Sequence, residues 1–265
     1  MTYFGFLLIF LVIPILIMVG LSWRDRRHGL ETAVSLRSWP IGRAITLHVL
    51  IALAYTTLWD NYLVATNVWW YDPELVTGFT IGWVPIEEYT FFILQPILGG
   101  LWLWFLMHHL SLKVDGELKS SLRKWSVAAL GVVWLVMVLV LISGWKPGTY
   151  LALELGWALP PIMLQLGFGA DILWRYRKLV MLSIVPLTLY LSFADLLAIH
   201  WGTWTIDPAQ SLHILLGGIL PVEELIFFLI TNTLVTFGIT LIMAKESHQR
   251  FAELSVKFKA LRVSE

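Results

Sequence analysis

A stretch that occurs twice decides how this chain folds: PIEEYTFF at 85–92 returns as PVEELIFF at 221–228. An aspartate, a tryptophan and an Asp-Pro dipeptide precede both copies in the same order: Asp60, Trp69 and Asp72-Pro73 in the first, Asp195, Trp204 and Asp207-Pro208 in the second. Agreement over uncommon residue types in a fixed order indicates an internal duplication.

Composition shows which solvent the duplicated unit folds in. Of the 265 residues, 58% are hydrophobic and 14% are charged. A soluble domain of this size does not carry so much apolar surface, whereas a lipid bilayer accommodates it. The net charge of zero gives no argument for a nucleic-acid partner. The lack of cysteine excludes disulfides and thiolate metal sites.

Seven apolar segments are long enough to cross a hydrocarbon core of about 30 Å as helices. They lie near 3–22, 44–66, 80–106, 125–143, 149–173, 179–200 and 213–243. Backbone groups in lipid must be paired internally, and segments of this length achieve that as helices rather than as barrel strands. The expected fold class is therefore all-α, a polytopic membrane protein of seven transmembrane helices.

Basic residues are distributed unevenly around these segments. All 18 Lys and Arg residues except Lys146 fall on one side of the expected membrane. They occupy the loops at 24–43, 113–124 and 175–178 and the tail at 245–262. Because basic loops remain in the cytoplasm, the pattern predicts a multi-pass protein of the cell membrane with its N-terminus outside and its C-terminus in the cytoplasm. The tail mixes charges with Phe251 and Leu254, which indicates an amphipathic helix on the inner surface.

The two copies of the motif also predict how the segments correspond. The second and third segments match the sixth and seventh, the first is expected to match the fifth, and the fourth joins the halves. This parallel 3+1+3 arrangement keeps both repeats in one orientation, with a pseudo-twofold axis along the membrane normal. It divides the chain into a first repeat at 1–110, a linking helix at 111–145 and a second repeat with the tail at 146–265.

Two pairs of glutamates are the main candidates for a functional site: Glu87 and Glu88, and Glu223 and Glu224. We expect them about seven residues, or roughly 10 Å, inside parallel helices. A charge at such a depth costs about 3 kcal/mol, so these residues should face a cavity or a partner. Two adjacent carboxyl groups away from water do not both ionise. Each pair therefore offers a neutral acid beside a base, as general acid–base catalysis requires.

Further residues repeat beside the glutamates on the same helical stripes. They are Phe91, Phe92 and Gln95 in the first copy and Phe227, Phe228 and Thr231 in the second. Aromatic faces stabilise a developing cation. Successive residues of a helix point about 100° apart, so one glutamate of a pair is expected to do chemistry while the other tunes it. Helical geometry alone leaves open which one does so.

The duplicated aspartates have more than one interpretation. Asp60 and Asp195 are predicted supporting residues of the site, but each stands near a segment end and is also compatible with a hydrated position. Asp72 and Asp207 precede proline and are typical of turns. Glu154, in the fifth segment, is a weaker candidate acid.

These motifs, with the upstream Asp and Trp in both copies, resemble the lycopene cyclase domain that occurs twice in fused bacterial and archaeal carotenoid cyclases. The resemblance covers about two-thirds of the chain. It implies conversion of lycopene to β-carotene without net redox change, with the first glutamate of each pair, Glu87 and Glu223, as proton donor. No flavin, other cofactor or metal is expected, and the chain carries no G-x-G-x-x-G fingerprint. The expected partners are lycopene, related carotenoids and the lipid bilayer, while the oligomeric state stays open.

Alternatives from other classes were weighed against this hypothesis. A proton-coupled transporter or a non-catalytic carotenoid-binding membrane protein also fits duplicated helices that carry acids. A retinal-binding pump needs a lysine inside the last segment, and 213–243 contains none. The ring isomer formed and the length of the carotenoid stay open. Because duplicated membrane folds bind at the repeat interface, we expect one composite chamber lined by both glutamate pairs rather than two chambers.

Overall fold

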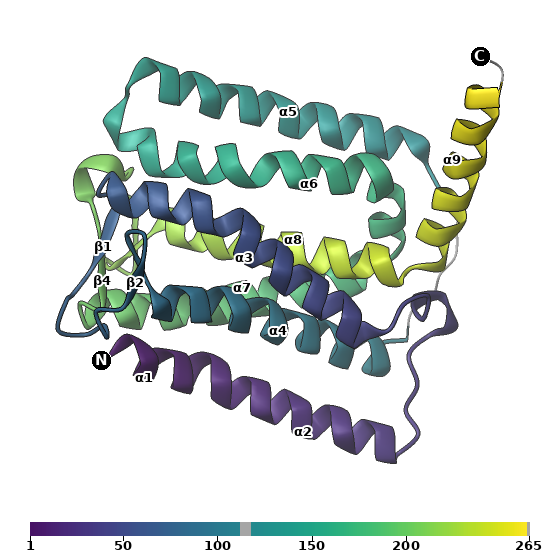
Figure 1. The fold of residues 1–265 in the computed structure, drawn as a ribbon, viewed down its shortest axis with the longest axis horizontal. Coiled ribbons are helices and arrows are strands. Elements are labelled where there is room, and N and C mark those ends of the chain that lie inside the picture. The colour runs from purple at the N-terminus through teal and green to yellow at the C-terminus, as the bar shows by residue number, and fades with distance from the viewer. Residues whose placement is uncertain (112–117, 264–265) are drawn as a thin grey trace.

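The computed structural model describes residues 1–111 and 118–263, so Lys113, one of the basic loop residues, lies outside the described residues. Within the described part, seven helices are long and apolar enough to cross a membrane, which confirms the prediction (Figure 1). The first consists of α1 (Tyr3–Leu7), a π-helical turn (Leu8–Val12) and α2 (Ile13–Arg27). The others are α3 (Ile41–Ala65, after a 3-10 turn at Val34–Leu36), α4 (Ile86–His109), α5 (Ser120–Ser143), α6 (Thr149–Arg175, after a 3-10 turn at Lys146–Gly148), α7 (Arg177–His200) and α8 (Val222–Met243).

The helices form a bundle with two different ends (Figure 1). Short strands gather at one end, here called the hairpin end, and α9 (Lys245–Val263) crosses the other, here called the tail end. In the centre, α4, α7 and α8 contact one another. Around them α2 packs on α4, α3 packs on both α4 and α8, and α6 packs on α8. Helix α5 packs on α6, and none of the residues of α5 is buried.

The fold is mostly helical as expected, and the described residues also form six strands of two or three residues each. Strand β1 (Trp69–Tyr71) pairs antiparallel with β4 (Trp204–Ile206), so the loop after α3 is joined to the loop after α7. Hairpins precede the two motif helices: β2 (Thr80–Ile81) with β3 (Val84–Pro85) before α4, and β5 (Leu215–Leu216) with β6 (Leu220–Pro221) before α8. A 3-10 turn at Pro208–Gln210 follows β4.

The predicted starts of the third and seventh helices, at 80 and 213, are wrong, because 80–85 and 213–221 contain the hairpins and are not helical. Both are apolar enough to read as membrane helix, but their glycines at the turns, Gly82 (φ +68°) and Gly217 (φ +60°), adopt a left-handed conformation that glycine tolerates best. The hairpins also pair their own backbone groups, so they need no helix to satisfy them. The glutamate pairs therefore occupy the first turns of α4 and α8, not a position about 10 Å along them.

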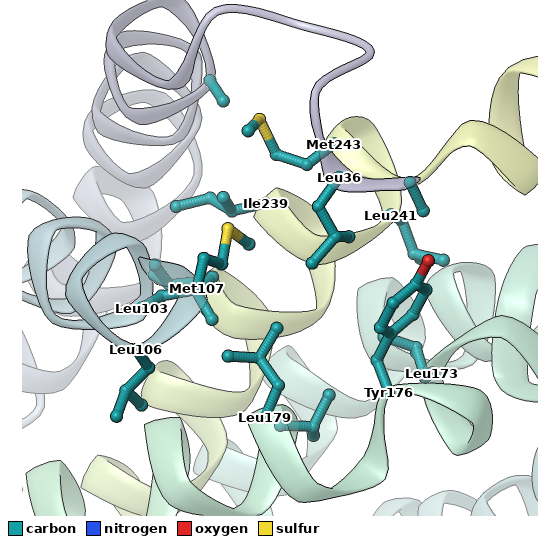
Figure 2. Packing of buried hydrophobic residues seen from close by; sticks show 14 of the residues in the cluster. Leu36, Leu103, Leu106, Met107, Leu173, Tyr176, Leu179, Ile239, Leu241 and Met243 are labelled. Carbon is teal, nitrogen blue, oxygen red and sulfur yellow. The ribbon is translucent and has the colours of Figure 1, made fainter. Parts of the chain in front are cut away.

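Apolar packing at the tail end holds the central helices together (Figure 2). Leu103 and Met107 of α4, Leu179 of α7 and Ile239 of α8 are at most 2% exposed and belong to one cluster, with Leu36 between them. Between helices in a lipid bilayer, such close packing stabilises through van der Waals contacts and not through removal from water. This cluster therefore fixes α4, α7 and α8 relative to one another, and so determines how the first turns of α4 and α8 meet the last turns of α7 at the hairpin end.

Candidate active site

Glu88 and Glu224 face a common cavity. They come from the first turns of α4 and α8, and both line a partly enclosed space of about 40 Å³ at the hairpin end. Asp195 of α7 lines it too. The remaining walls are mostly aromatic: Phe6, Trp69, Phe91, Trp204, Phe227 and Phe228. We call this space the acid chamber. It takes one glutamate from each half of the chain.

Tyrosine hydroxyls hold both chamber glutamates. Tyr3 and Tyr71 each donate a hydrogen bond to Oε2 of Glu88, the second at 3.0 Å. Tyr150 donates to Oε1 of Glu224 at 2.6 Å. Hydrogen bonds to an ionised oxygen are stronger than those between neutral groups, so these phenols stabilise a carboxylate that has just given up its proton. Burial, reinforced by the Asp60 and Glu88 carboxyls, raises the pKa of Tyr71 well above its usual value, so Tyr71 remains a donor.

Glu87 and Glu223 have a different environment from their neighbours. Oε1 of Glu87 accepts the backbone N–H of Thr77 at 2.6 Å, and Oε1 of Glu223 accepts that of Leu212 at 2.7 Å. Both side chains are at most 1% exposed, and neither lines the acid chamber. Each ties the loop before its helix to the first helical turn. The expectation that both members of each pair line one chamber is therefore wrong for the first glutamates, and their assignment as proton donors stays a prediction.

Asp60 and Asp195 are buried, at 1% and 2% exposed, so the interpretation of these residues as hydrated helix ends is wrong. Oδ1 of Asp195 accepts the indole N–H of Trp204 at 2.9 Å. Asp60 has no hydrogen-bond partner within the described residues, and neither does Glu154, which is fully buried on α6. Asp72 and Asp207 form turns as predicted, because each accepts the N–H of the residue two positions later.

The remaining supporting residues divide between two cavities. Phe91 and Phe227 line both the acid chamber and a neighbouring cavity. Phe228 lines the acid chamber and not the neighbouring cavity. Phe92, Gln95 and Thr231 line only the neighbouring cavity of the two. The amide of Gln95 donates to Asn232 on α8 at 2.7 Å, a contact between α4 and α8. Phe91 and Phe227 therefore lie between the acid chamber and the neighbouring cavity.

The paired strands close the acid chamber at the hairpin end. Trp69 and Tyr71 of β1 and Trp204 and Ile206 of β4 all line it. A ladder of two short strands has little stability of its own. This one is packed on Tyr3 of α1, whose ring stacks on Tyr71 at 5.9 Å and lies 4.9 Å from Trp204. Aromatic side chains thus separate the glutamates from the loop surface.

Sequence reasoning missed Tyr3, Tyr71 and Tyr150, the three residues that hold the acids. For two of them a signal was present, because Tyr3 and Tyr150 each stand at the start of an apolar segment, and these two segments are the ones expected to correspond in the predicted repeats. Tyr71 has no such signal, since the matching strand carries Ile206. Within the described residues, no group of three or more His, Cys, Asp or Glu side chains is positioned to hold a metal ion.

A bundle of membrane-spanning helices that encloses carboxyl groups in an aromatic cavity defines a class: membrane proteins that handle an apolar molecule beside buried acids. The chain is 37% identical over 201 residues to "Lycopene beta-cyclase" of Halobacterium salinarum, across 75% of this chain and 82% of that protein. The chain therefore belongs to the lycopene β-cyclase family.

The chain is also similar to fungal proteins. "Bifunctional lycopene cyclase/phytoene synthase" of Podospora anserina is 32% identical over 197 residues, 72% of this chain and 33% of that protein. The Aspergillus oryzae protein of the same name is 32% identical over 234 residues, 85% of this chain and 39% of that protein. No family model matches the chain. No solved structure matches it.

Proposed function

We propose that this protein is a carotenoid cyclase that converts lycopene to β-carotene by proton-initiated ring closure at the chain ends. Membership of the lycopene β-cyclase family supports the substrate. The observation that carries the chemistry is the meeting of Glu88 and Glu224 in one small aromatic chamber. Such a chamber offers a neutral carboxylic acid, a base and little room for water, which general acid–base chemistry on a hydrocarbon requires.

The reaction needs only proton transfers and the electrons of the polyene. A glutamic acid in the chamber gives its proton to a carbon of the terminal double bond, which leaves a tertiary carbocation and a carboxylate. A nearby double bond attacks the cation, and a carbon–carbon bond closes a six-membered ring. A ring carbon then loses a proton to a carboxylate. The acid is restored, no electrons are exchanged with another molecule, and the carbon that loses its proton decides the ring type.

The family resemblance predicts Glu87 and Glu223 as the proton donors, but we assign the proton transfers to Glu88 and Glu224, because these two line the chamber. Glu87 and Glu223, which hold the loops before their helices, have positioning roles in this proposal. The phenols of Tyr3, Tyr71 and Tyr150 favour the carboxylate formed in the first step. The rings of Phe91, Phe227 and Phe228 present π faces to the cation. Asp195 supplies a further carboxyl beside Glu224.

The proposal includes an internal duplication with one chamber at its twofold axis. Reciprocal backbone contacts support it. The N–H of Asp72 donates to Thr203 O at 3.2 Å. The N–H of Asp207, which matches Asp72, donates to Val68 O at 2.8 Å. Such an exchange, in which matched residues make each other's contacts, is typical of a twofold interface.

Helix packing supports the same arrangement. The contact of α2 with α4 has its counterpart in that of α6 with α8, and the contact of α3 with α4 in that of α7 with α8. Between the two halves, the contact of α3 with α8 has its counterpart in the contact of α7 with α4. Helix α5 has no counterpart and packs outside. We therefore keep the division into repeats at 1–110 and 146–265 with a linking helix at 111–145.

The membrane placement is also a proposal. Basic residues favour the cell membrane, with the N-terminus outside and the cytoplasm at the tail end. The acid chamber would then lie on the outer side of the membrane. Helix α9 fits a position at the inner surface, because Phe251 and Leu254 are 70% and 40% exposed.

The experiment is expression of single variants in bacteria that accumulate lycopene, followed by pigment analysis. We expect Glu88→Gln and Glu224→Gln to leave lycopene unreacted, because an amide cannot give a proton to carbon. Glu87→Gln and Glu223→Gln are expected to retain activity, because an amide oxygen still accepts the Thr77 or Leu212 N–H. Glu74→Gln, an exposed loop residue, is the matched control. Near-normal β-carotene from both Glu88→Gln and Glu224→Gln would refute direct proton donation.

The same strain tests the alternative of a transporter or non-catalytic carotenoid-binding protein. The intact chain would then leave the pigment linear. A change from lycopene to a cyclic carotenoid, dependent on a chamber glutamate, supports the cyclase instead.

A further inference from the structure

Two further cavities lie beyond the acid chamber along the bundle, and each shares lining residues with the one before it. A neighbouring cavity of about 190 Å³ lies between α3, α4, α6 and α8, and it shares Phe91 and Phe227 with the chamber. A wider space toward the tail end shares His48, Ile51 and Gln165 with this cavity. Together they follow α8 from Phe227 to Ile242, about 22 Å at 1.5 Å per residue. We call this the α3–α6 groove.

The α3–α6 groove has a lining suited to a hydrocarbon. Within the described residues, no Lys, Arg, Asp or Glu lines it. Several of its polar groups are directed to backbone or side-chain partners. His48 Nδ1 bonds to Ala44 O at 2.8 Å, and the Gln165 amide donates to Leu234 O at 3.0 Å. The face left to an occupant is therefore mostly apolar.

The groove also opens sideways. At the hairpin end α3 is tied to α6, because Tyr55 donates to Trp157 O at 2.9 Å and Trp59 donates to Leu153 O at 3.1 Å. Further along, Ile51 and Leu164 flank the groove and are 51% and 76% exposed. This outer surface of a membrane-spanning bundle faces the lipid tails. A long apolar molecule can thus enter from the bilayer without crossing water.

A second groove lies between α2 and α7 over α4, on the opposite side of the bundle. Its helices are joined by a hydrogen bond like that of Tyr55: the Tyr190 hydroxyl donates to Phe10 O at 3.0 Å. It shares no lining residue with the acid chamber among the described residues. One difference is the residue on the inner wall: α7 carries Leu187 where α3 carries Ala52. The smaller side chain leaves the α3–α6 groove open next to the chamber.

We infer that the α3–α6 groove is the binding site for the unreacted length of a linear polyene, whose end group reaches the acid chamber between Phe91 and Phe227. The inference rests on the proposed cyclase function and adds the substrate's path and the residue that controls it. Ala52 is the specificity-determining position, because its small side chain admits the polyene beside the chamber. After one end has reacted, the molecule leaves sideways and re-enters with its other end first.

The test compares Ala52→Phe with Ala54→Phe. Both make the same change on the same helix, but Ala54 is exposed and lines none of these cavities. Each substitution is made in two backgrounds, the otherwise wild-type chain and a chain that carries Glu88→Gln and Glu224→Gln. Each protein is then purified in detergent from lycopene-accumulating cells. Total carotenoid per protein is measured. We expect Ala52→Phe to lower the amount of bound carotenoid about tenfold in both backgrounds, because the phenyl ring fills space beside the chamber that the polyene would occupy. Ala54→Phe should leave it unchanged.

Further variants keep the result interpretable. Ala52→Leu introduces the residue that α7 carries at the matching position, Leu187, so the bundle should tolerate it. We expect it to lower the amount of bound carotenoid less than Ala52→Phe does. Ile17→Phe narrows the groove between α2 and α7 and should leave the amount of bound carotenoid unchanged. The inference would be overturned if the Ala52→Phe and Ala54→Phe proteins bound equal amounts of carotenoid, or if only Ile17→Phe lowered the amount bound. Failure of the intact chain to form any cyclic carotenoid would instead overturn the proposed function.

Discussion

Tyr150 provides a test of chemistry at the residue scale. It brings a phenol from α6 to Glu224 on α8, 2.6 Å from Oε1. A hydrogen bond to a charged group contributes about 1.5–3 kcal/mol, so Tyr150→Phe should lower kcat roughly tenfold to a hundredfold. KM should change little, because the phenol stabilises the carboxylate formed during proton transfer and not the bound hydrocarbon. The measurement is cyclisation of lycopene in liposomes at several substrate concentrations.

Tyr62→Phe is the control for this substitution, since Tyr62 is 54% exposed on α3. It removes a phenol of the same kind from the outer surface and should leave both kinetic constants unchanged. An increase in KM with kcat intact for Tyr150→Phe would mean that Tyr150 shapes the binding space and does not assist proton transfer.

At the scale of elements, α9 is held to the bundle by polar contacts at the tail end. Arg250 makes two hydrogen bonds to Asp171, at 2.8 and 2.7 Å, and the Tyr176 hydroxyl lies 3.3 Å from both carboxylate oxygens of Glu246. Burial, together with Glu246, raises the pKa of Tyr176 to about 12. Neutral Tyr176 therefore stabilises the folded state fully below its ordinary value of 10.0, and this contribution is lost as pH rises toward 12.

The corresponding prediction concerns thermal unfolding in detergent at pH 8 to 11. Wild-type protein should have a higher Tm than Tyr176→Phe at pH 8, and the difference should shrink above about pH 10. The exposed Tyr62→Phe substitution should give no such trend. A difference in Tm that stays constant or widens up to pH 11 would show that ionisation of Tyr176 does not weaken the attachment of α9.

At the scale of the whole molecule, the question is whether the two halves of the chain, which we propose are repeats, work separately or together. Glu88 and Glu224 line one chamber, so removing either pair should stop both ring closures. We expect Glu87→Gln with Glu88→Gln, and equally Glu223→Gln with Glu224→Gln, to leave unreacted lycopene in lycopene-producing cells. Pigment extraction and chromatography distinguish linear, monocyclic and bicyclic products. Substantial monocyclic or bicyclic product from either double variant would mean that each repeat has a chamber of its own.

Several properties of the whole molecule follow from the sequence alone. Long apolar segments fold as helices in lipid because backbone groups there need internal partners, so length and composition suffice to predict seven spanning helices. Asp72 and Asp207 before proline form turns through contacts within their own loops. The glutamate pairs, with their matched neighbours, indicated the family that the Halobacterium relative establishes.

Only the tertiary structure decided which side chains meet. The hairpins before α4 and α8 adjoin the apolar segments and contain no charged residue, so hydropathy did not separate them from the helices. They bring the glutamates to the first helical turns. Periodicity assigns Glu87 and Glu88 to different faces of α4, but the neighbouring helices determine which face meets the chamber. Tyr3 and Tyr150 reach their glutamates from other helices, and the difference between Ala52 and Leu187 matters only because of what packs beside each. A local pattern describes one element, whereas a site formed between elements depends on how their surfaces fit together.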